Sequence, residues 1–257
     1  MVRDESIYGK ILYQDETHKF VWLGADPEIK AGVVQTNQYL INDKGRGILL
    51  DPGGIHLFSR VVAAASRYIS LEKIDTIIFS HQDPDVSSGI ALWLGVTPSI
   101  IYISQLWMRF LPHFGIIDEH RIKGIEVSDK KLSLPSGSSM IFLPAHFMHS
   151  LGNYSVYDER SKILFSGDIG AAVFKPGEEY LFVEDFDKHI SLMKPFHSRY
   201  MVANKVCRKW VDTVSKFDVQ MIAPQHGAIF RGEDVNRFLN WLSELPCGVD
   251  NLEEIYG

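Results

Sequence analysis

The stretch Phe79-Ser80-His81-Gln82-Asp83-Pro84-Asp85 holds a dense group of side chains able to bind a metal ion. It follows Thr76–Phe79, a β-branched and aromatic run that predicts a buried strand ending at Ser80-His81. Residues 81, 83 and 85 alternate, so an extended backbone stiffened by Pro84 would place all three side chains on one side. One imidazole and two carboxylates on the same side of a loop could chelate a metal ion.

Three other segments place a histidine or an aspartate directly after an apolar run, where a layered sheet would deliver its loops to one edge. They are Phe147-Met148-His149-Ser150-Leu151-Gly152-Asn153, Phe165-Ser166-Gly167-Asp168 and Ala223-Pro224-Gln225-His226-Gly227. Together the four segments supply three imidazoles and three carboxylates, from His81, Asp83, Asp85, His149, Asp168 and His226.

This set is too large for one tetrahedral zinc ion, which takes four ligands. Two ions about 3.5–4 Å apart could share six ligands, with one carboxylate bridging them. Each segment alone has a plainer interpretation, because a histidine at a strand end is usually a core or surface residue and an acidic turn can simply be solvated. The four segments together predict a two-metal site.

The composition is typical of a globular protein with a sizeable core: 257 residues, of which 46% are hydrophobic, 23% charged and 12% aromatic. It excludes a disordered chain, a fibre and a disulfide-stapled mini-protein. The net charge of −6 comes without a basic cluster, so a nucleic-acid or anionic-membrane surface is not indicated. Met1–Glu16 carries charges where a signal peptide needs an apolar stretch, and no apolar run approaches the roughly 18 residues of a membrane span. We expect a cytoplasmic protein in which Cys207 and Cys247 are free thiols, although a disulfide between them stays open.

Strand-like and helix-like segments alternate without a repeat or a linker, which predicts one α/β or α+β layered domain over residues 1–257. Short apolar runs predict strands at 47–50, 76–79, 99–103, 140–143, 155–157, 163–165 and 221–223. Apolar residues at helical spacing predict helices at 58–69, 88–95, 186–194, 201–216 and 233–245.

From about Phe20 to Leu245 the pattern resembles the metallo-β-lactamase superfamily. The motifs that carry the resemblance are Leu50-Asp51-Pro52-Gly53, Ser80-His81-x-Asp83-x-Asp85, His149-Ser-x-Gly-Asn153, Ser166-Gly167-Asp168 and Gln225-His226-Gly227. The resemblance implies a four-layered αβ/βα sandwich with a metal pair at one edge of the sheets.

Within the superfamily, the sequence is most similar to the flavo-diiron branch. Zinc hydrolases carry H-x-H-x-D-H, with histidines where this chain has Asp83 and Val86, whereas the flavo-diiron motif is H-x-E-x-D. Exchanging an imidazole for a carboxylate favours iron over zinc. The 19-residue step from His149 to Asp168 is also the step found in that branch.

The resemblance implies a role for each ligand of a diiron centre. It assigns His81, Asp83 and His149 to one iron, Asp85 and His226 to the other, and Asp168 to the bridge between them. Val86 replaces a histidine found there in much of the branch, which removes a base near the second iron. His146 would be a pocket residue beside the ligands, and Tyr180 would line the pocket mouth. No catalytic residue beyond the ligands is implied.

Flavo-diiron enzymes reduce O2 or NO with electrons from an FMN domain that comes next in the same chain. This sequence ends at Gly257, about where the metal domain should end, and it contains no flavodoxin-like segment or glycine-rich phosphate loop, so no FMN is expected. It therefore resembles single-domain oxygen-binding diiron proteins associated with bacterial chemotaxis signalling. In these, ferrous iron binds O2, and a stable oxidised or peroxo state is signalled to partner proteins.

Two alternatives remain open at this point. One is a split O2 or NO reductase that receives electrons from a separate flavoprotein or rubredoxin. The other is a zinc hydrolase of the same fold. The sensor is favoured because the chain lacks a built-in donor and because Val86 removes a possible proton donor near the second iron. A homodimer is a further expectation, from the head-to-tail dimers of flavo-diiron enzymes.

Overall fold

The structure is a computed structural model that describes residues 9–26, 33–116, 118–175 and 177–257. Its chain divides into two compact units. The first unit contains the chain up to Phe142 together with Glu159–Ser161, and the second contains Leu143–Asp158 and Lys162–Gly257. Each unit combines strands of a mixed sheet with helices, which confirms the predicted α/β class. The assignment of residues 1–257 to one domain stays a prediction.

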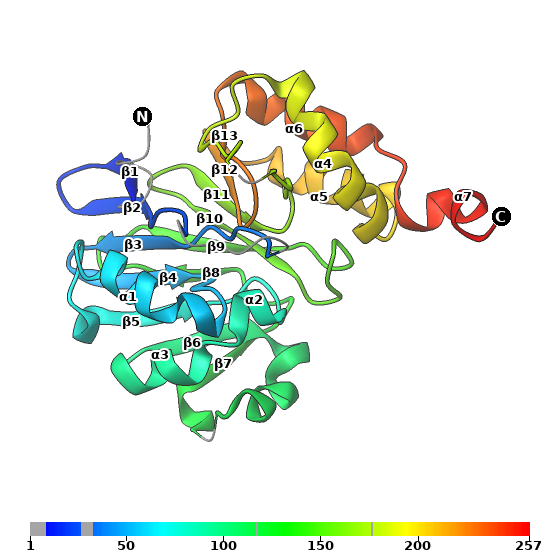
Figure 1. Ribbon diagram of the computed structural model, residues 1–257. Coiled ribbons are helices and arrows are strands. Elements are labelled where there is room, and N and C mark those ends of the chain that lie inside the picture. Colours follow the sequence, from blue (N-terminus) through cyan, green and yellow to red (C-terminus); the bar gives the residue numbers. More distant parts are fainter. Residues whose placement is uncertain (1–8, 27–32, 117, 176) are drawn as a thin grey trace. The chain divides into compact units, whose positions relative to one another are not determined.

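The first unit contains a seven-stranded sheet with the order β1-β2-β3-β4-β5-β6-β7 (Figure 1). Strands β1 to β4 pair antiparallel, and β4 to β7 pair parallel. Because parallel strands end at one edge of a sheet, the loops after β4 and β5 leave it as neighbours. The strands are β1 (Lys10–Gln14), β2 (His18–Trp22), β3 (Tyr39–Asp43), β4 (Arg46–Leu50), β5 (Ile74–Ile78), β6 (Ile100–Ser104) and β7 (Ile122–Ile125).

Helices cover the sheet of the first unit and bury its apolar core. Val61 of α1 and Trp93 of α3 belong to one buried cluster with Ile77 of β5 and Ile101 of β6. Val86, directly after the predicted ligands, is part of the same cluster. The remaining elements of this unit are η1 (Ile55–Leu57), α1 (Phe58–Ala65), η2 (Leu71–Lys73), α2 (Pro84–Ser87), α3 (Ile90–Val96), η3 (Gln105–Phe114), η4 (Glu119–Arg121) and the antiparallel hairpin of β8 (Lys131–Ser133) and β9 (Ser139–Pro144), whose last two residues fall in the second unit.

In the second unit, strands β10 to β13 lie in the order β13-β12-β11-β10. The α-helices α4 to α7 belong to the same unit. Only β11 and β12 pair parallel, so the loops after them leave the sheet at the same edge. The elements are β10 (Tyr154–Asp158), β11 (Ile163–Gly167), α4 (Phe186–Tyr200), α5 (Asn204–Val214), β12 (Met221–Pro224), β13 (Phe230–Arg231), α6 (Glu233–Glu244), η5 (Gly248–Asn251) and α7 (Leu252–Tyr256).

Each predicted strand is present within a residue or two, whereas the predicted helix boundaries contain errors. The helix predicted at 201–216 begins at Asn204, because Met201 is extended and bridges Met148. The helix predicted at 186–194 continues through Pro195 to Tyr200. The helix predicted at 58–69 ends at Ala65.

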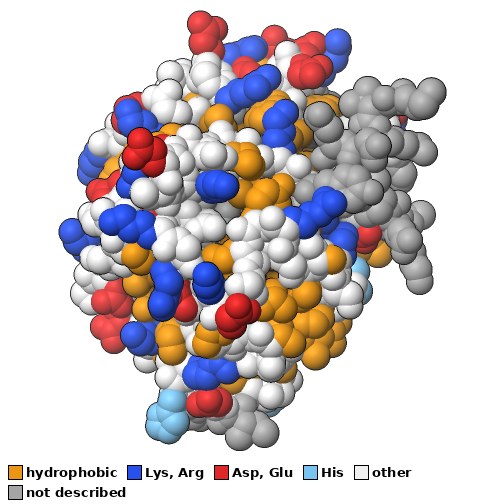
Figure 2. Space-filling model, turned by 90° about the vertical axis from the view of Figure 1, so that its left-hand side faces the viewer, with side chains coloured by type: hydrophobic (Ala, Val, Ile, Leu, Met, Phe, Trp, Pro, Cys, Tyr) orange, Lys and Arg blue, Asp and Glu red, His pale blue; other side chains and the backbone are white. Residues whose placement is uncertain are grey.

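The surface carries charges of both signs. On the face drawn in Figure 2, Lys and Arg side chains lie among Asp and Glu side chains and hydrophobic ones. This mixture fits the sequence, in which the net charge of −6 comes without a basic cluster. Among the described helices, none combines the length and the apolar character needed to cross a bilayer.

Candidate metal centre

In the first unit, a chain of hydrogen bonds orients the ring of His81. The carboxylate of Asp51 accepts the backbone N–H of Ser80 at 2.8 Å and the Ser80 hydroxyl at 2.5 Å. Because that hydroxyl proton is directed to Asp51, the same oxygen accepts the Nδ1–H of His81, at 2.8 Å. The network therefore places the imidazole proton on Nδ1 and leaves Nε2 with the lone pair that a metal needs. All three residues are fully buried.

Asp83 and Asp85, the two predicted acidic ligands of the first unit, do not lie on one extended segment. Nε2 of His81 lies 3.7 Å from Oδ2 of Asp83, so these two donors do face the same space. Asp83, however, is the N-cap of α2, Pro84 is its first residue, and Asp85 lies in its first turn. The predicted extended run is therefore wrong at Asp85, because proline's fixed φ suits the first helical position and starts a helix there.

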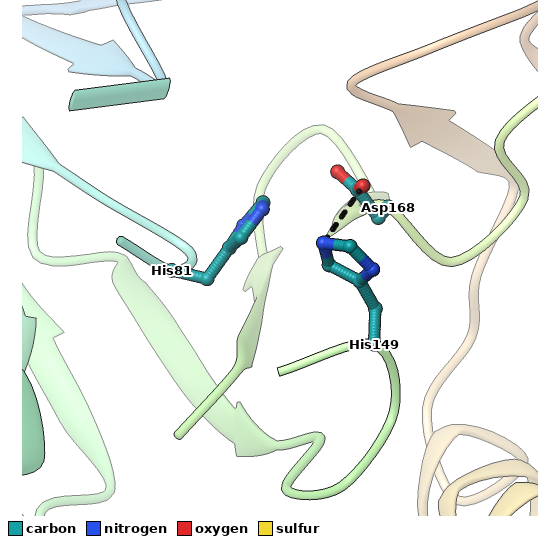
Figure 3. Close-up of side chains that lie close together, drawn as sticks. All are labelled: His81, His149 and Asp168. Carbon is teal, nitrogen blue, oxygen red and sulfur yellow. Dashed lines mark ion pairs between the residues drawn. The ribbon is translucent and has the colours of Figure 1, made fainter. Parts of the chain in front are cut away.

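In the second unit, two predicted histidine ligands face one buried carboxylate, that of the predicted ligand Asp168. Oδ2 of Asp168 lies 3.4 Å from Nε2 of His149, and Oδ1 lies 3.8 Å from Nε2 of His226. Figure 3 shows the His149 ring edge turned toward Asp168. Both separations exceed the usual 2.7–3.2 Å of an N–H···O hydrogen bond. Each oxygen of Asp168 thus faces a different imidazole, so the chemistry of this donor set fits a metal pair.

The loop that carries His149 has an unusual backbone held by polar bonds. Phe147 and His149 have φ values of 66° and 68°, in the left-handed region that non-glycine residues rarely adopt. The side-chain amide of Asn153 donates to the carbonyl of Met148 at 2.9 Å and supports this turn. The ring of His149 lies 5.4 Å from that of Phe196, measured between centroids, which limits its rotation.

His197 is a residue of this region that the sequence reasoning missed. Its Nε2 accepts the backbone N–H of Gly170 at 2.9 Å, two residues after Asp168, and its Nδ1 lies 2.9 Å from the carbonyl of Met193. Burial lowers the pKa of His197 to about 4, so the ring is neutral and can both accept and donate. It therefore supports the turn that holds Asp168. A histidine on the apolar face of α4 was the signal that could have found it.

The predicted pocket residues take different places. Val86 is fully buried in the core of the first unit, and His146 packs edge-on against Tyr154 with its pKa lowered by burial. The hydroxyl of Tyr180 lies 2.6 Å from Nδ1 of His189, and burial raises the pKa of that tyrosine. Tyr180 thus supports a buried histidine, and its predicted position at a pocket mouth stays a prediction.

Comparison with known proteins gives the family. The model of the ODP family beta lactamase matches residues 34–227. The chain belongs to this family. The solved structure of the peroxy diiron species of the chemotaxis sensor ODP is 59% identical, covers 96% of this chain and 99% of its own, and superposes with a TM-score of 0.87. The apo state of the chemotaxis sensor ODP from T. denticola is 58% identical over 96% of this chain and 99% of its own, with a TM-score of 0.85.

More distant relatives agree on the fold. A variant of the flavo di-iron protein from Thermotoga maritima is 19% identical over 92% of this chain and 60% of its own, with a TM-score of 0.77. The curated relatives are diflavin flavoproteins from Nostoc and Synechocystis, and this ODP-family chain spans only 30–37% of their length. The predicted metallo-β-lactamase fold and the flavo-diiron resemblance are confirmed.

Proposed function

We propose that this ODP-family chain is a non-heme diiron protein that binds and senses dioxygen. The observation that carries the proposal is its 59% identity, over nearly the full length of both chains, to a chemotaxis sensor solved as a peroxy diiron species. Each of the six predicted ligands has a chemistry suited to iron, with imidazole and carboxylate donors and no thiolate.

The proposed ligands are the six residues that the sequence predicts. One iron would be held by His81, Asp83 and His149, and the other by Asp85 and His226, while Asp168 would contribute to both. Support for the bridge comes from the two oxygens of Asp168, which face two different histidines at 3.4 and 3.8 Å. Support for the His81 assignment comes from the Asp51–Ser80 network, which leaves Nε2 as the donor atom.

Two ferrous ions, when bound, supply the electrons that dioxygen binding and reduction require. The side chains of the protein determine whether protons can reach the site. Val86 is apolar and fully buried, so no proton donor stands at its position beside Asp85. Because proton transfer drives a reduced oxygen species toward water, its absence favours a long-lived oxygen-bound state over turnover. A state that persists can be read by a partner protein.

The proposed output is a protein–protein signal of the chemotaxis type, as the name of the matched sensor indicates for that protein. The cytoplasmic location and the homodimer stay predictions, and so does the identity of the partner.

The test is an anaerobic Fe(II) titration of the full chain, followed by one addition of O2. We expect two irons per chain, uptake of one O2 and a persistent visible charge-transfer band. Asp168→Asn should lose the band, whereas Asp43→Asn, which alters a buried His–Asp pair elsewhere, should keep it. Repeated O2 consumption with a flavoprotein or rubredoxin donor would instead indicate a split reductase. Tight zinc binding without iron uptake would indicate a hydrolase.

A further inference from the structure

The two cysteines of the chain meet in the interior of the second unit. Cys207 lies on α5, and Cys247 directly precedes η5, 40 residues later. Their sulfur atoms are 3.7 Å apart, and both residues are fully buried free thiols. Because the sequence contains only two cysteines, each is the other's only intramolecular partner for a disulfide.

Polar bonds, and not packing alone, hold the two thiols together. Asn204, in the first turn of α5, donates its side-chain amide to the carbonyl of Leu245 at 2.9 Å and its backbone N–H to Asp250 at 2.6 Å. The same carboxylate of Asp250 accepts the backbone N–H of Cys247 at 3.1 Å. The start of α5 is therefore tied to the chain on both sides of Cys247, which fixes Cys207 opposite it.

The environment makes the two sulfurs chemically different. The hydrogen bond between the thiols raises the pKa of Cys207, and burial raises it further. The same bond lowers the pKa of Cys247, whose sulfur also accepts the backbone N–H of Asp250. Because the thiolate is the reactive form, the sulfur that two donors stabilise as a thiolate has more of it, and the protonated neighbour can follow as the second reactant. Cys247 is therefore placed to react first.

We propose that Cys207 and Cys247 form a redox-active dithiol that a hydroperoxide converts into an intramolecular disulfide. The Cys247 thiolate attacks one oxygen of hydrogen peroxide, which forms an S–O bond and breaks the O–O bond. The hydroxide that leaves takes up the proton that Cys247 released and becomes water. Cys207 then attacks the sulfur of the resulting sulfenic acid, forms the S–S bond and releases a second water. Two thiols lose two electrons, and one peroxide is reduced to two waters.

Closure needs little movement and a brief opening for the oxidant. A disulfide is about 2.05 Å long, so the sulfur atoms must approach by somewhat less than 2 Å, which side-chain rotation with a small backbone shift can provide. The segment after Cys247 is exposed on many side chains: Val249 by 53%, Leu252 by 45% and Tyr256 by 83%. Thinly packed segments open locally at low free-energy cost, which would admit hydrogen peroxide.

The pair is connected to the loop of a proposed iron ligand through backbone contacts of the second unit. Val249 donates its N–H to the carbonyl of Val202 at 2.8 Å, and Val202 donates to the carbonyl of Phe147 at 3.2 Å, two residues before His149. Gly248 lies so close that a Cβ there would come within 2.2 Å of the Val202 carbonyl oxygen. A disulfide that fixes Cys247 would therefore restrain this path.

The first test uses the full chain, stripped of metal by a chelator, reduced, and treated with hydrogen peroxide. Titration with dithionitrobenzoate under denaturing conditions should fall from two thiols per chain to none. Peptide mapping should show a Cys207–Cys247 disulfide, with a mass about 2 Da below that of the dithiol. Dithiothreitol should restore the dithiol. Two persistent thiols, at a peroxide concentration that fully oxidises free glutathione, would overturn the proposal. Because no iron is present, the result is independent of the proposed oxygen sensing.

A matched pair of variants tests the order of attack. In Cys207→Ser, dimedone should trap a sulfenic acid on Cys247, whereas in Cys247→Ser the remaining thiol should react about tenfold more slowly. The reverse order would overturn the assignment of the nucleophile. Hydrogen exchange on the wild-type disulfide form should show the amides of Val202 and Val249 exchanging about tenfold more slowly than in the dithiol form. Unchanged exchange would overturn the link to the His149 loop.

Discussion

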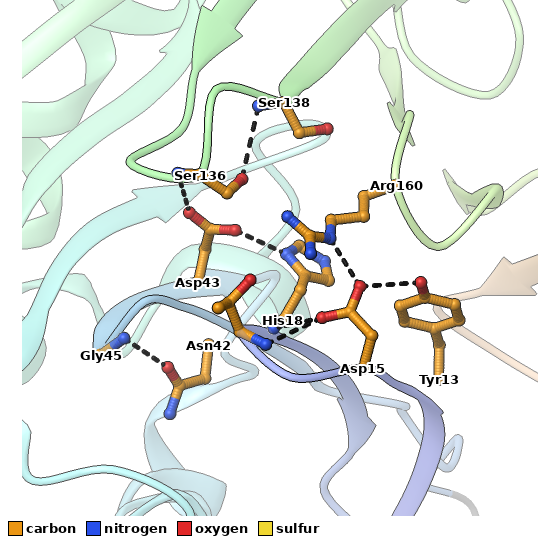
Figure 4. A network of polar contacts seen from close by, with 10 residues as sticks. Tyr13, Asp15, His18, Asn42, Asp43, Gly45, Ser136, Ser138 and Arg160 are labelled. Carbon is orange, nitrogen blue, oxygen red and sulfur yellow. Dashed lines mark hydrogen bonds and ion pairs between the residues drawn. The ribbon is translucent and has the colours of Figure 1, made fainter.

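Two buried histidine–aspartate groups, one in each unit, use the same side chains at different spacings. In the first unit, Nδ1 of His18 lies 2.8 Å from Asp43, whose other oxygen accepts the N–H of Ser136 at 2.8 Å (Figure 4). In the second unit, Asp168 lies 3.4 and 3.8 Å from its two histidines. The atoms of the first group lie within hydrogen-bond distance, whereas those of the second group lie farther apart than a usual hydrogen bond.

The environment of each group matches that difference. Burial raises the pKa of Asp43, but the hydrogen bonds from His18 and Ser136 outweigh it and keep the carboxyl pKa below its usual range. Next to this pair, Arg160 donates to Asp15 at 2.6 Å, and Tyr13 donates to the same carboxylate at 2.9 Å (Figure 4). These bonds stabilise a corner of the fold. The Asp168 group lacks such short contacts to its two histidines, and we propose it as a metal site.

The strongest test of the comparison is removal of the proposed bridge. Asp168→Ala should abolish the binding of both irons, because each proposed ion loses a carboxylate oxygen and the two positive charges lose the anion between them. Iron per chain, measured after anaerobic loading and desalting, should fall from two to near zero, while circular dichroism stays native. Two retained irons in a folded variant would exclude Asp168 as the bridge.

The matching change in the first unit should affect stability and leave iron in place. Asp43→Ala strands a fully buried histidine without its acceptor, which should cost about 3 kcal/mol in the free energy of unfolding. Urea unfolding of the metal-free protein measures this loss. Asp187→Asn, at a residue whose pair with Arg237 is largely exposed, is the control and should leave the midpoint unchanged. A loss of iron in Asp43→Ala would remove the distinction between the two groups.

A smaller effect is expected from the hydroxyl that orients His81. Ser80→Ala removes the acceptor for Nδ1–H, so the ring loses its preferred tautomer and direction, and iron affinity should fall roughly 10- to 100-fold. Competition with a chromophoric chelator measures the change. Ser99→Ala is the control, since that buried hydroxyl donates to the carbonyl of Ile74, away from the ligands. Equal affinity in both variants would show that Ser80 does not position His81.

The sequence predicted the ligand segments because each follows a buried strand, and strand ends are where apolar periodicity stops and loops begin. It missed β1 to β3, in which charged and polar residues such as Lys19 and Asn42 interrupt the apolar runs. It also gave Asp85 an extended backbone, although Pro84 supplies a helix start. The apolar face of α4 could have indicated His197, but its partner Gly170 lies 27 residues away and the partner of Asp51 lies 29 residues away, so the local pattern does not identify these contacts.

The smallest expected effect concerns a histidine beside neither group's carboxylate. Burial lowers the pKa of His189 to about 4, against 6.5 for an unfolded histidine. The unfolded chain therefore binds a proton more tightly than the folded one, so this residue stabilises the fold above pH 6.5 and the contribution is lost as the pH falls toward 4. At pH 5 the loss should be about 2 kcal/mol, with no further change from pH 7 to 8. Urea unfolding of metal-free protein at these pH values measures the slope, and His189→Gln should reduce it by close to one proton. If the variant keeps the full wild-type slope, the slope comes from other groups, such as His197, whose pKa burial also lowers to about 4.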